Sequence, residues 1–552
     1  MKIALAQINY HAGNITYNTL KIKRAIREAK ELGADLIVFS ELSVCGYPPR
    51  DLLNSDVFID NCLEAVNDIA NDCQGIAAIV GSPSFNRNPG GKRLLNSAYV
   101  LADGQVDDVY HKGLMPTYDV FNEYRYFEPA TEFNTVNIAG KKVSLTICED
   151  IWNIAGQGMY AMDPPGELAV ESPDLMINIS ASPFAWNHLP GRMQTLSENA
   201  RRYALPVFSV NLIGGQTDLL FDGGSAVFNP EGKLVDMFPL FQESLQVYDV
   251  DKVIHDPGKE IPAIPSGAAK HQFIMDALVL GVRDYFAKTG LKQAILGLSG
   301  GIDSAVSLVV AVKALGKENV WAVLLPGPYS SDHSVNDALE LAGKLGVRRD
   351  TISINEAVSS FESSLASHFE NTDSGLAEEN IQARARAVIL MALSNKFGHM
   401  LLNTSNKSEA AVGYGTLYGD ICGGLSVLGD VYKTDVYGLA ELINKQEEII
   451  PVNTIEKPPS AELKPDQKDT DSLPDYGVLD QILYAYIEEQ KDPASIIDMG
   501  WDPELVYRVL KMVDTSEYKR HQSPPILRVS LKCLGVGREM PLEASYKGLR
   551  RS

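Results

Sequence analysis

Short runs of apolar residues alternate with longer stretches of mixed polarity along the first half of the chain. Apolar runs bounded by polar or turn-forming residues are typical of buried strands. The strands that we expect here are KIALAQI, DLIVFSE, AAIVGSP, SAYVLA, KVSLTIC, DLMINIS and PVFSVNL. Residues 17 to 32 and 190 to 203 have apolar positions at helical spacing, so they predict helices between strands. The segment SAVFNPEGKLV, which begins at Ser225, predicts a hairpin.

The pattern changes between residues 251 and 270, where Pro257, Pro262 and Pro265 stand among several charges. Such a stretch is typical of a linker. Beyond it come AILGLSGGIDSAVSLVVAVKAL, then VWAVLLP, then MLLNTS. This order of strand, loop and helix predicts a doubly wound, Rossmann-like parallel sheet. We therefore predict an α/β chain with domains at 1–250 and 271–552 and a linker at 251–270. A later stretch at 456–474 is rich in Pro, Asp and Lys and predicts a flexible loop.

Charge and composition exclude several classes of protein. The chain of 552 residues has a formal net charge of −22, which disfavours nucleic acid as a partner because phosphate contacts need a basic surface. No apolar run reaches the roughly 20 residues of a membrane span. None of the six cysteines forms a C-x-x-C pair, which disfavours a zinc site or a redox motif. We expect reduced cysteines and a cytoplasmic location.

One candidate nucleophile is Cys148, which follows the apolar run SLTI. A thiol attacks as the thiolate and needs a base or a cation nearby. Glu41 closes the expected strand DLIVFSE and could take the thiol proton. Lys112 follows another apolar stretch and could stabilise a thiolate and an oxyanion. Each residue taken singly is also compatible with core packing or a solvated surface.

The segments FSELSVCGYP, HKGLMPTY, TICEDIW and NISASPF resemble the carbon-nitrogen hydrolase, or nitrilase-like, superfamily over roughly residues 1 to 250. The resemblance implies an α-β-β-α sandwich. It also implies that Glu41 is a general base, Lys112 an oxyanion stabiliser and Cys148 the nucleophile. A fused enzyme with such a domain would release ammonia from glutamine.

Further positions match the amide-binding residues of that superfamily. By the resemblance, Glu123 lies beside the triad, and Tyr118 and Ser182 hold the glutamine. His188 stands where the superfamily usually has Lys or Arg, and Arg192 is the alternative contact for the glutamine carboxylate.

A second constellation is the run SGGIDS at residues 299–304, between an expected strand and an expected helix. Two glycines allow a tight turn and close approach to phosphate. Loop amides and a helix N-terminus together bind anions. Asp303 could hold magnesium against the same phosphates. The run resembles the pyrophosphate loop of ATP pyrophosphatases, which cleave ATP between its α and β phosphates and activate a substrate as its adenylate.

More segments favour one branch of that family. LLNTSNKSEAAVGYGTLYGD, AEENIQARAR, PSAELKPDQKD and EYKRHQSPP resemble the NAD synthetase pattern. The resemblance implies an ATP site at Gly297, Leu298, Ser299, Gly300, Gly301, Ile302, Asp303, Ser304 and Thr404. It implies a deamido-NAD site at Asn380, Arg384, Glu409, Lys433 and Lys519. It also implies Mg²⁺ held by Asp303 and Glu409.

The combined resemblance implies that deamido-NAD is amidated to NAD, the last step of NAD biosynthesis, with ATP cleaved to AMP and pyrophosphate and with glutamine as the ammonia source. A homodimer or larger homo-oligomer through the synthetase domain is expected as well. Three alternatives stay open on sequence alone. They are another ATP-pyrophosphatase ligase such as a GMP synthetase, an amidase half that serves only as a scaffold, and a nucleotide-sensing module without catalysis.

Overall fold

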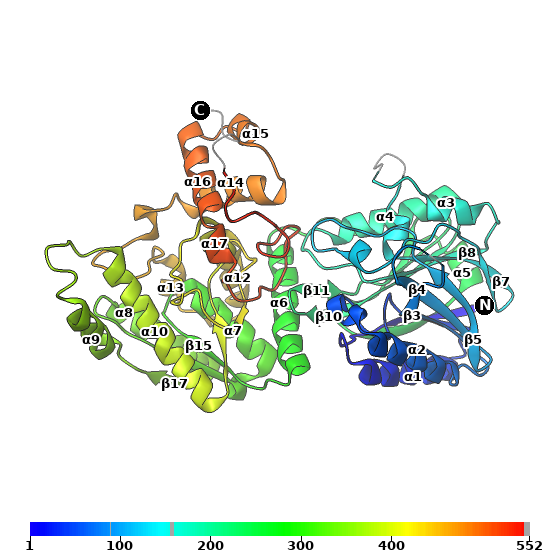
Figure 1. Cartoon of the computed structure of the whole chain (residues 1–552), viewed down its shortest axis with the longest axis horizontal. Coiled ribbons are helices and arrows are strands. Elements are labelled where there is room, and N and C mark those ends of the chain that lie inside the picture. The colour runs from blue at the N-terminus through cyan, green and yellow to red at the C-terminus, as the bar shows by residue number, and fades with distance from the viewer. Residues whose placement is uncertain (89, 155–158, 546–552) are drawn as a thin grey trace. The chain divides into compact units, whose positions relative to one another are not determined.

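The computed structural model describes residues 1–88, 90–154 and 159–545 (Figure 1). The chain divides into two compact units, Met1–Ile264 and Pro265–Ser552. The division falls inside the segment 251–270, whose first part is the short helix α5 (Val250–His255).

The first unit contains two six-stranded sheets with the orders β14-β1-β2-β3-β4-β5 and β13-β12-β9-β8-β7-β6. The first sheet comprises β1 (Lys2–Gln7), β2 (Leu36–Val38), β3 (Ala77–Phe85), β4 (Leu94–Ala102), β5 (Gln105–His111) and β14 (Ser244–Asp249). The second comprises β6 (Val136–Ile138), β7 (Lys141–Ile147), β8 (Leu175–Ser180), β9 (Val207–Asn211), β12 (Ala226–Phe228) and β13 (Leu234–Met237). A separate hairpin joins β10 (Ile213–Gln216) to β11 (Leu219–Asp222). Strands lie in all seven of the segments expected from the sequence, and the predicted hairpin is formed by β12 and β13.

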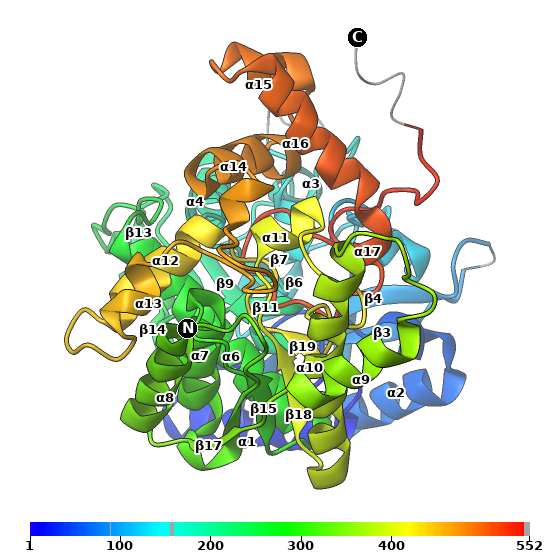
Figure 2. The ribbon, with the colours of Figure 1, turned by 90° about the vertical axis from the view of Figure 1, so that its left-hand side faces the viewer.

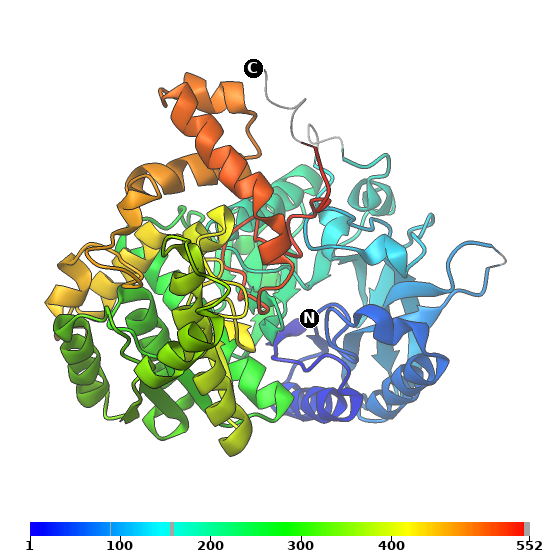
Figure 3. The ribbon, with the colours of Figure 1, turned by 60° about the vertical axis from the view of Figure 1, so that its left-hand side comes forward.

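Helices cover the outer faces of the two sheets. α1 (Ile15–Glu31) and α2 (Asp56–Ala70) pack together and cover the first sheet, as the blue helices of Figures 1 and 3 show. α4 (Leu189–Tyr203) contacts β9 and β12, and α3 (Pro164–Ala169) contacts β7. The helices expected at 17–32 and 190–203 correspond to α1 and α4. The result is the expected α-β-β-α sandwich.

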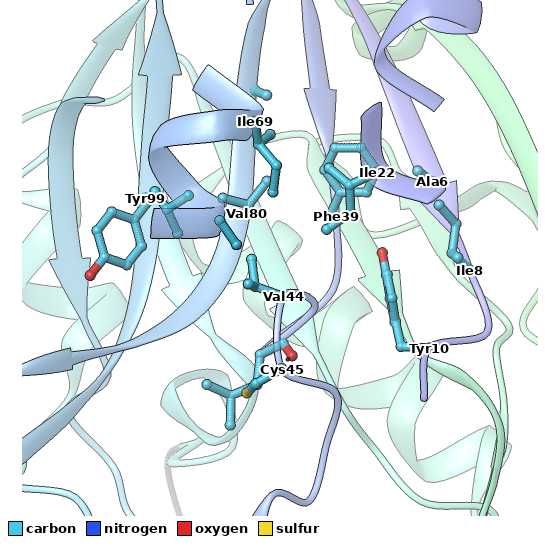
Figure 4. Close-up of a cluster of buried hydrophobic side chains, with 14 of the residues drawn as sticks. Ala6, Ile8, Tyr10, Ile22, Phe39, Val44, Cys45, Ile69, Val80 and Tyr99 are labelled. Atoms are coloured by element: carbon cyan, nitrogen blue, oxygen red, sulfur yellow. Dashed lines mark hydrogen bonds between the residues drawn. The ribbon is translucent and has the colours of Figure 1, made fainter. Parts of the chain in front are cut away.

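Strand β1 explains why the sandwich has two apolar layers. Alternate side chains of a strand point to opposite faces. Ala4 and Ala6 join a cluster with α1 and α2, whereas Ile3 and Leu5 join the cluster between the two sheets. Figure 4 shows the first layer, in which side chains from the sheet and from both helices meet. Both faces of β1 are therefore buried, which accounts for its nearly continuous apolar run.

The second unit contains a five-stranded sheet with the order β17-β16-β15-β18-β19, in which every neighbouring pair is parallel. Its strands are β15 (Ala294–Gly297), β16 (Val320–Leu324), β17 (Arg348–Thr351), β18 (Met400–Asn403) and β19 (Leu425–Ser426). The chain runs outward from β15 to β17 and then crosses back to β18. The order therefore reverses between β15 and β18, and ligands of such sheets bind outside the carboxyl ends of the strands at that point.

Helices lie on both sides of this parallel sheet, as predicted. Figure 2 shows α7 and α8 on one side of β15 and β18 and α9 and α10 on the other. The helices of the second unit that precede β18 are α6 (Ala268–Thr289), α7 (Ile302–Leu315), α8 (Asp332–Leu345), α9 (Asn355–Leu365) and α10 (Leu376–Phe397). The helices that follow β18 are α11 (Lys407–Val412), α12 (Lys433–Ile443), α13 (Val452–Glu456), α14 (Tyr476–Leu483), α15 (Pro493–Asp498), α16 (Pro503–Thr515) and α17 (Glu517–Arg520). Across the described ranges, no helix is both long enough and apolar enough to cross a membrane.

Candidate active sites

Cys148 begins the turn that follows β7. Its φ angle is +46°, a left-handed conformation that is strained for a residue with a side chain. A short 3-10 helix, Cys148–Ile151, starts at this residue. A sharp turn of this kind at the end of a strand is a common way to present a nucleophile. The strand-to-turn position expected for Cys148 is therefore confirmed, and the side chain is almost completely buried.

Lys112 links two buried carboxylates. Its Nζ lies 2.7 Å from Glu41 Oε1 and 2.7 Å from Glu123 Oε2. Asn96 in β4 donates to Glu41 Oε1 at 2.7 Å, and the backbone N–H of Ala181 donates to Glu41 Oε2 at 3.1 Å. These bonds leave little freedom to the Glu41 carboxylate. Residues that are far apart in sequence thus form one buried hydrogen-bonded cluster.

The electrostatics of this cluster keep the resting thiol protonated. Burial and the nearby Glu41 carboxylate raise the pKa of Cys148 well above its usual value, and Lys112 only partly opposes them. Burial also raises the pKa of Glu123 to about 7, against the opposing effect of Lys112. Burial acts to lower the pKa of Lys112, but Glu123 and Glu41 outweigh it and raise that pKa. A protonated thiol requires a base for attack, and Glu41 is held close enough to Lys112 and Cys148 for their charges to interact.

Tyr118 lies in the same region and donates its hydroxyl to Glu149 Oε1 at 3.0 Å. The Tyr160 hydroxyl donates to the same oxygen at 2.8 Å. Ser182 follows β8, and its backbone N–H donates to Asn211 Oδ1 at 2.8 Å. Sequence reasoning did not single out Glu149, although it directly follows Cys148 and is itself buried.

The two candidates for holding a glutamine carboxylate differ in their surroundings. Arg192 donates from both terminal nitrogens to Asp222, at 2.9 Å and 3.1 Å, and Nη2 also donates to the Gly223 carbonyl. It is buried, and both of its terminal nitrogens already bind that carboxylate, although Nε has no partner among the described residues. His188 stacks on Trp152 with ring centroids 5.7 Å apart. Arg192 therefore already binds a carboxylate of the protein itself, whereas His188 packs against an aromatic ring.

A cavity of about 600 Å³ opens in the second unit. It lies where the loops after β15 and β18 meet, at the point where the strand order reverses. With the exception of Gly300, all of the residues expected to bind ATP or deamido-NAD line it; they are Gly297, Leu298, Ser299, Gly301, Ile302, Asp303, Ser304, Asn380, Arg384, Thr404, Glu409, Lys433 and Lys519. The structure thus brings together residues from five separate stretches of the chain, at 297–304, 380–384, 404–409, 433 and 519.

The glycine-rich loop is preformed around Ser304. The Ser304 hydroxyl donates to the Gly301 carbonyl at 2.9 Å and accepts from the Ser299 N–H at 3.3 Å. Gly300 has φ +83°, and a Cβ there would lie 2.1 Å from the Ser334 carbonyl oxygen. Only glycine fits this position. Gly300 therefore packs against the backbone of Ser334, on the side of the loop that does not line the cavity.

Asp303 and Glu409 converge on one cation, the Lys433 ammonium, at 2.5 Å and 3.2 Å. Asn406 contacts both residues. Its Nδ2 donates to Asp303 Oδ1 at 2.9 Å and so orients that carboxylate, and its Oδ1 accepts the backbone N–H of Glu409 at 2.9 Å. Burial raises the pKa of Glu409 to about 7, against the opposing effect of Lys433. The described residues contain no group of three or more His, Cys, Asp or Glu that could hold a metal by itself. Two carboxylates beside a phosphate loop fit Mg²⁺ when nucleotide phosphates complete its oxygen ligands.

Three of the residues expected to bind deamido-NAD form hydrogen bonds to the loop that connects α11 to β19. Asn380 Oδ1 accepts from the Thr416 hydroxyl at 2.7 Å, and Arg384 Nε donates to the Leu417 carbonyl at 3.2 Å. Lys519 Nζ donates to the carbonyls of Gly413 and Gly415, each at 2.7 Å. Burial lowers the pKa of Lys519. These side chains stabilise this wall of the cavity.

The predicted loop at 456–474 forms another part of the cavity wall. Pro458 to Leu463 and Asp469 line the cavity. Glu462 Oε1 accepts from the hydroxyls of Ser331 and Ser334 at 2.9 Å and 2.6 Å. Asp469 accepts from the Tyr414 and Tyr476 hydroxyls and is buried, although sequence reasoning assigned it no role.

Comparison with known proteins gives two family matches. The carbon-nitrogen hydrolase family matches residues 2–256, and the NAD synthase family matches residues 274–523. Two relatives named glutamine-dependent NAD(+) synthetase span nearly the whole chain. The protein from Synechocystis sp. is 44% identical, with 99% of each chain covered, and the protein from Thermotoga maritima is 38% identical with the same coverage.

Solved structures agree with these matches. A glutamine-dependent NAD⁺ synthetase from Acinetobacter baumannii, in complex with ADP, is 40% identical, with a TM-score of 0.76 and 98% of each chain covered. A glutamine-dependent NAD(+) synthetase from Cytophaga hutchinsonii is 20% identical with a TM-score of 0.83, covering 100% of this chain and 99% of the other. At that identity the second similarity supports the fold alone.

Proposed function

Since the chain belongs to the glutamine-dependent NAD(+) synthetases, a family of carbon-nitrogen ligases that amidate deamido-NAD with ammonia from glutamine and use ATP as co-substrate, we propose how its residues divide this work. Residues 1–250 form the amidase domain, residues 271–552 form the synthetase domain, and residues 251–270 link them. One observation supports this division best. The first unit contains the buried Glu41–Lys112 cluster near Cys148, and the second contains a cavity lined by the glycine-rich loop.

In the amidase domain, Cys148 is the nucleophile. Its thiol is protonated at rest, so Glu41 takes the proton as sulfur attacks the glutamine carboxamide and returns it to the departing ammonia. Lys112 stabilises the oxyanion, and Glu123 keeps the Lys112 ammonium in place. Water then attacks the thioester with Glu41 again as base, which releases glutamate. Tyr118, Ser182 and His188 hold the glutamine.

In the synthetase domain, residues 297–304 and Thr404 bind ATP. Loop amides and the N-terminus of α7 hold the phosphates, and Lys433 offsets their charge. The nicotinate carboxylate of deamido-NAD attacks the α-phosphorus and displaces pyrophosphate. Ammonia then displaces AMP from the adenylate. Asn380, Arg384, Glu409, Lys433 and Lys519 bind deamido-NAD or its reacting groups. When Mg²⁺ is bound, Asp303 and Glu409 hold it, and it neutralises charge on the phosphates.

We also propose a homodimer, formed through the synthetase domain. α10 exposes Leu376, Val388 and Met391, and the same helix carries Asn380 and Arg384 into the cavity wall. Exposed apolar residues beside a site mark a surface suited to a second copy. The six cysteines are free, which supports a location in the reducing cytoplasm.

The test of this function measures NAD and AMP with glutamine and then with ammonium as donor. For Cys148→Ala we expect no synthesis with glutamine and unchanged synthesis with ammonium, because only the amidase has lost its nucleophile. Cys45→Ala is a matched control, because it removes another buried thiol and should keep both activities. Loss of both activities in Cys148→Ala would instead make Cys148 structural. XMP offered beside deamido-NAD distinguishes the GMP synthetase alternative.

A further inference from the structure

Asp150 lies two residues after Cys148 and is buried, with 2% of its surface exposed. Its carboxylate accepts three backbone hydrogen bonds, each 2.9 Å long. Oδ1 accepts the N–H groups of Gly113 and Leu114, and Oδ2 accepts the N–H of Ile147. Asp150 therefore joins two segments that are more than thirty positions apart in the sequence.

These two segments are the ones that carry the reacting groups. Gly113 directly follows Lys112, and Ile147 directly precedes Cys148. Each oxygen of the carboxylate holds one segment, so the side chain fixes the distance between them. Burial raises the pKa of Asp150 to about 6, although the three backbone hydrogen bonds oppose this. Burial of a carboxylate is costly, and backbone N–H donors are what makes it tolerable here.

We infer that Asp150 is a positioning residue for glutamine hydrolysis, which holds the Lys112 ammonium at the working distance from the Cys148 sulfur. This inference rests on the proposed roles of Cys148 and Lys112. Neighbouring Glu149 differs, because it accepts from the side chains of Tyr118 and Tyr160, whereas Asp150 accepts from the backbone on both sides of the active centre.

The strained turn at Cys148 gives this role a physical reason. A non-glycine residue at φ +46° holds its conformation only when its surroundings impose it. The hydrogen bond from the Ile147 N–H to the Asp150 carboxylate closes the turn around Cys148. The hydrogen bonds from the N–H groups of Gly113 and Leu114 to the same carboxylate hold the backbone next to Lys112 against this turn. A displacement of about 1 Å between reacting groups costs on the order of 100-fold in rate.

The test is Asp150→Asn in the full chain. An amide has one oxygen, so its NH₂ group must face either the Ile147 N–H or the N–H pair of Gly113 and Leu114. We expect kcat with glutamine to fall about 100-fold while KM for glutamine stays within about threefold. NAD synthesis from ammonium should be unchanged, and it also reports that the chain has folded. Asp150→Glu, which keeps the charge but moves the oxygens by a methylene group, should show the same loss.

Asp218→Asn is the matched control, because Asp218 is a buried aspartate of the same unit that pairs with the Arg50 side chain. It should leave activity with both donors unchanged. A second readout is the pH profile of Cys148 alkylation by iodoacetamide. Its midpoint should move to higher pH in Asp150→Asn, since Lys112 no longer stabilises the thiolate as well.

Three results would overturn the inference. They are full activity of Asp150→Asn with glutamine, a higher KM with unchanged kcat, and an unchanged alkylation profile. Failure of the proposed function looks different, because Cys148→Ala would then either keep synthesis with glutamine or also lose synthesis with ammonium, whatever Asp150 does.

Discussion

At the scale of single residues, the amidase centre buries the ionisable side chains of Glu41, Lys112 and Cys148 almost completely. Lys112 is completely buried and offsets two carboxylates at once. Removal of one partner from such a group leaves an uncompensated charge, which is far more costly than the pair itself. Lys112 is held by both carboxylates, so the cluster keeps a partner for its ammonium even when Glu123 is protonated.

Glu123 gives the first unit a stability that depends on pH. Because the pKa of Glu123 is raised to about 7, the folded chain retains a proton that the unfolded chain has lost at mildly acidic pH. The folded state therefore loses stability as pH rises from about 4.5 to about 7. In Glu123→Gln the contribution of Glu123 should be absent, whereas buried Asp150, whose pKa is also raised, keeps its own contribution. Relative to the variant, the wild type should lose at least about 1 kcal/mol of unfolding free energy across that window.

Hydrogen exchange of the β3 and β4 amides in the full-length chain measures this free energy, since it reports the opening of that unit. Glu64→Gln on the surface of α2 is the control and should follow the wild type. Equal pH dependence in the wild type and in Glu123→Gln would contradict the expectation.

At the scale of elements, the turn between β15 and α7 decides whether phosphate can be bound. The backbone of Gly300 passes so close to the N-terminal part of α8 that no side chain fits between them. The loop amides can point at an anion only in this conformation.

Gly300→Ala should therefore weaken ATP binding at least about tenfold, because the loop must move and also adopt a strained φ. Gly290→Ala is a matched control, since Gly290 also has positive φ (+76°) but has open space around its Cβ position. Calorimetry with ATP measures both variants, and glutamine hydrolysis should persist in each. Equal affinities for the two variants would show that the contact with Ser334 does not shape the site.

At the scale of the whole molecule, each unit has its own core and its own site. The exposed apolar residues of α10 lie next to cavity-lining residues on the same helix. Formation of the proposed dimer there would bury this apolar surface.

The double substitution Val388→Glu with Met391→Glu should turn the dimer into a monomer, because a dimer would bury both introduced charges. Analytical ultracentrifugation measures the assembly, and synthesis from ammonium should fall in parallel. Val170→Glu introduces a charge at a residue of the first unit that is 83% exposed and should change neither. A wild-type chain that sediments as a monomer would refute the dimer.

The sequence by itself determined the elements, because the spacing of apolar residues is set by which face each element buries. It also determined the candidate chemistry, since Lys112, Cys148 and the glycine-rich loop stand directly after strands, and Glu41 lies three residues beyond the end of β2 rather than closing that strand as expected. Only the tertiary structure decided which side chains meet. Asp222 engages Arg192, and Asp150 joins the backbone beside Lys112 and Cys148. Asp469 lines the cavity and accepts from two tyrosine hydroxyls. No local pattern encodes such contacts, because their partners are distant in sequence and become neighbours only when the sheets and helices pack.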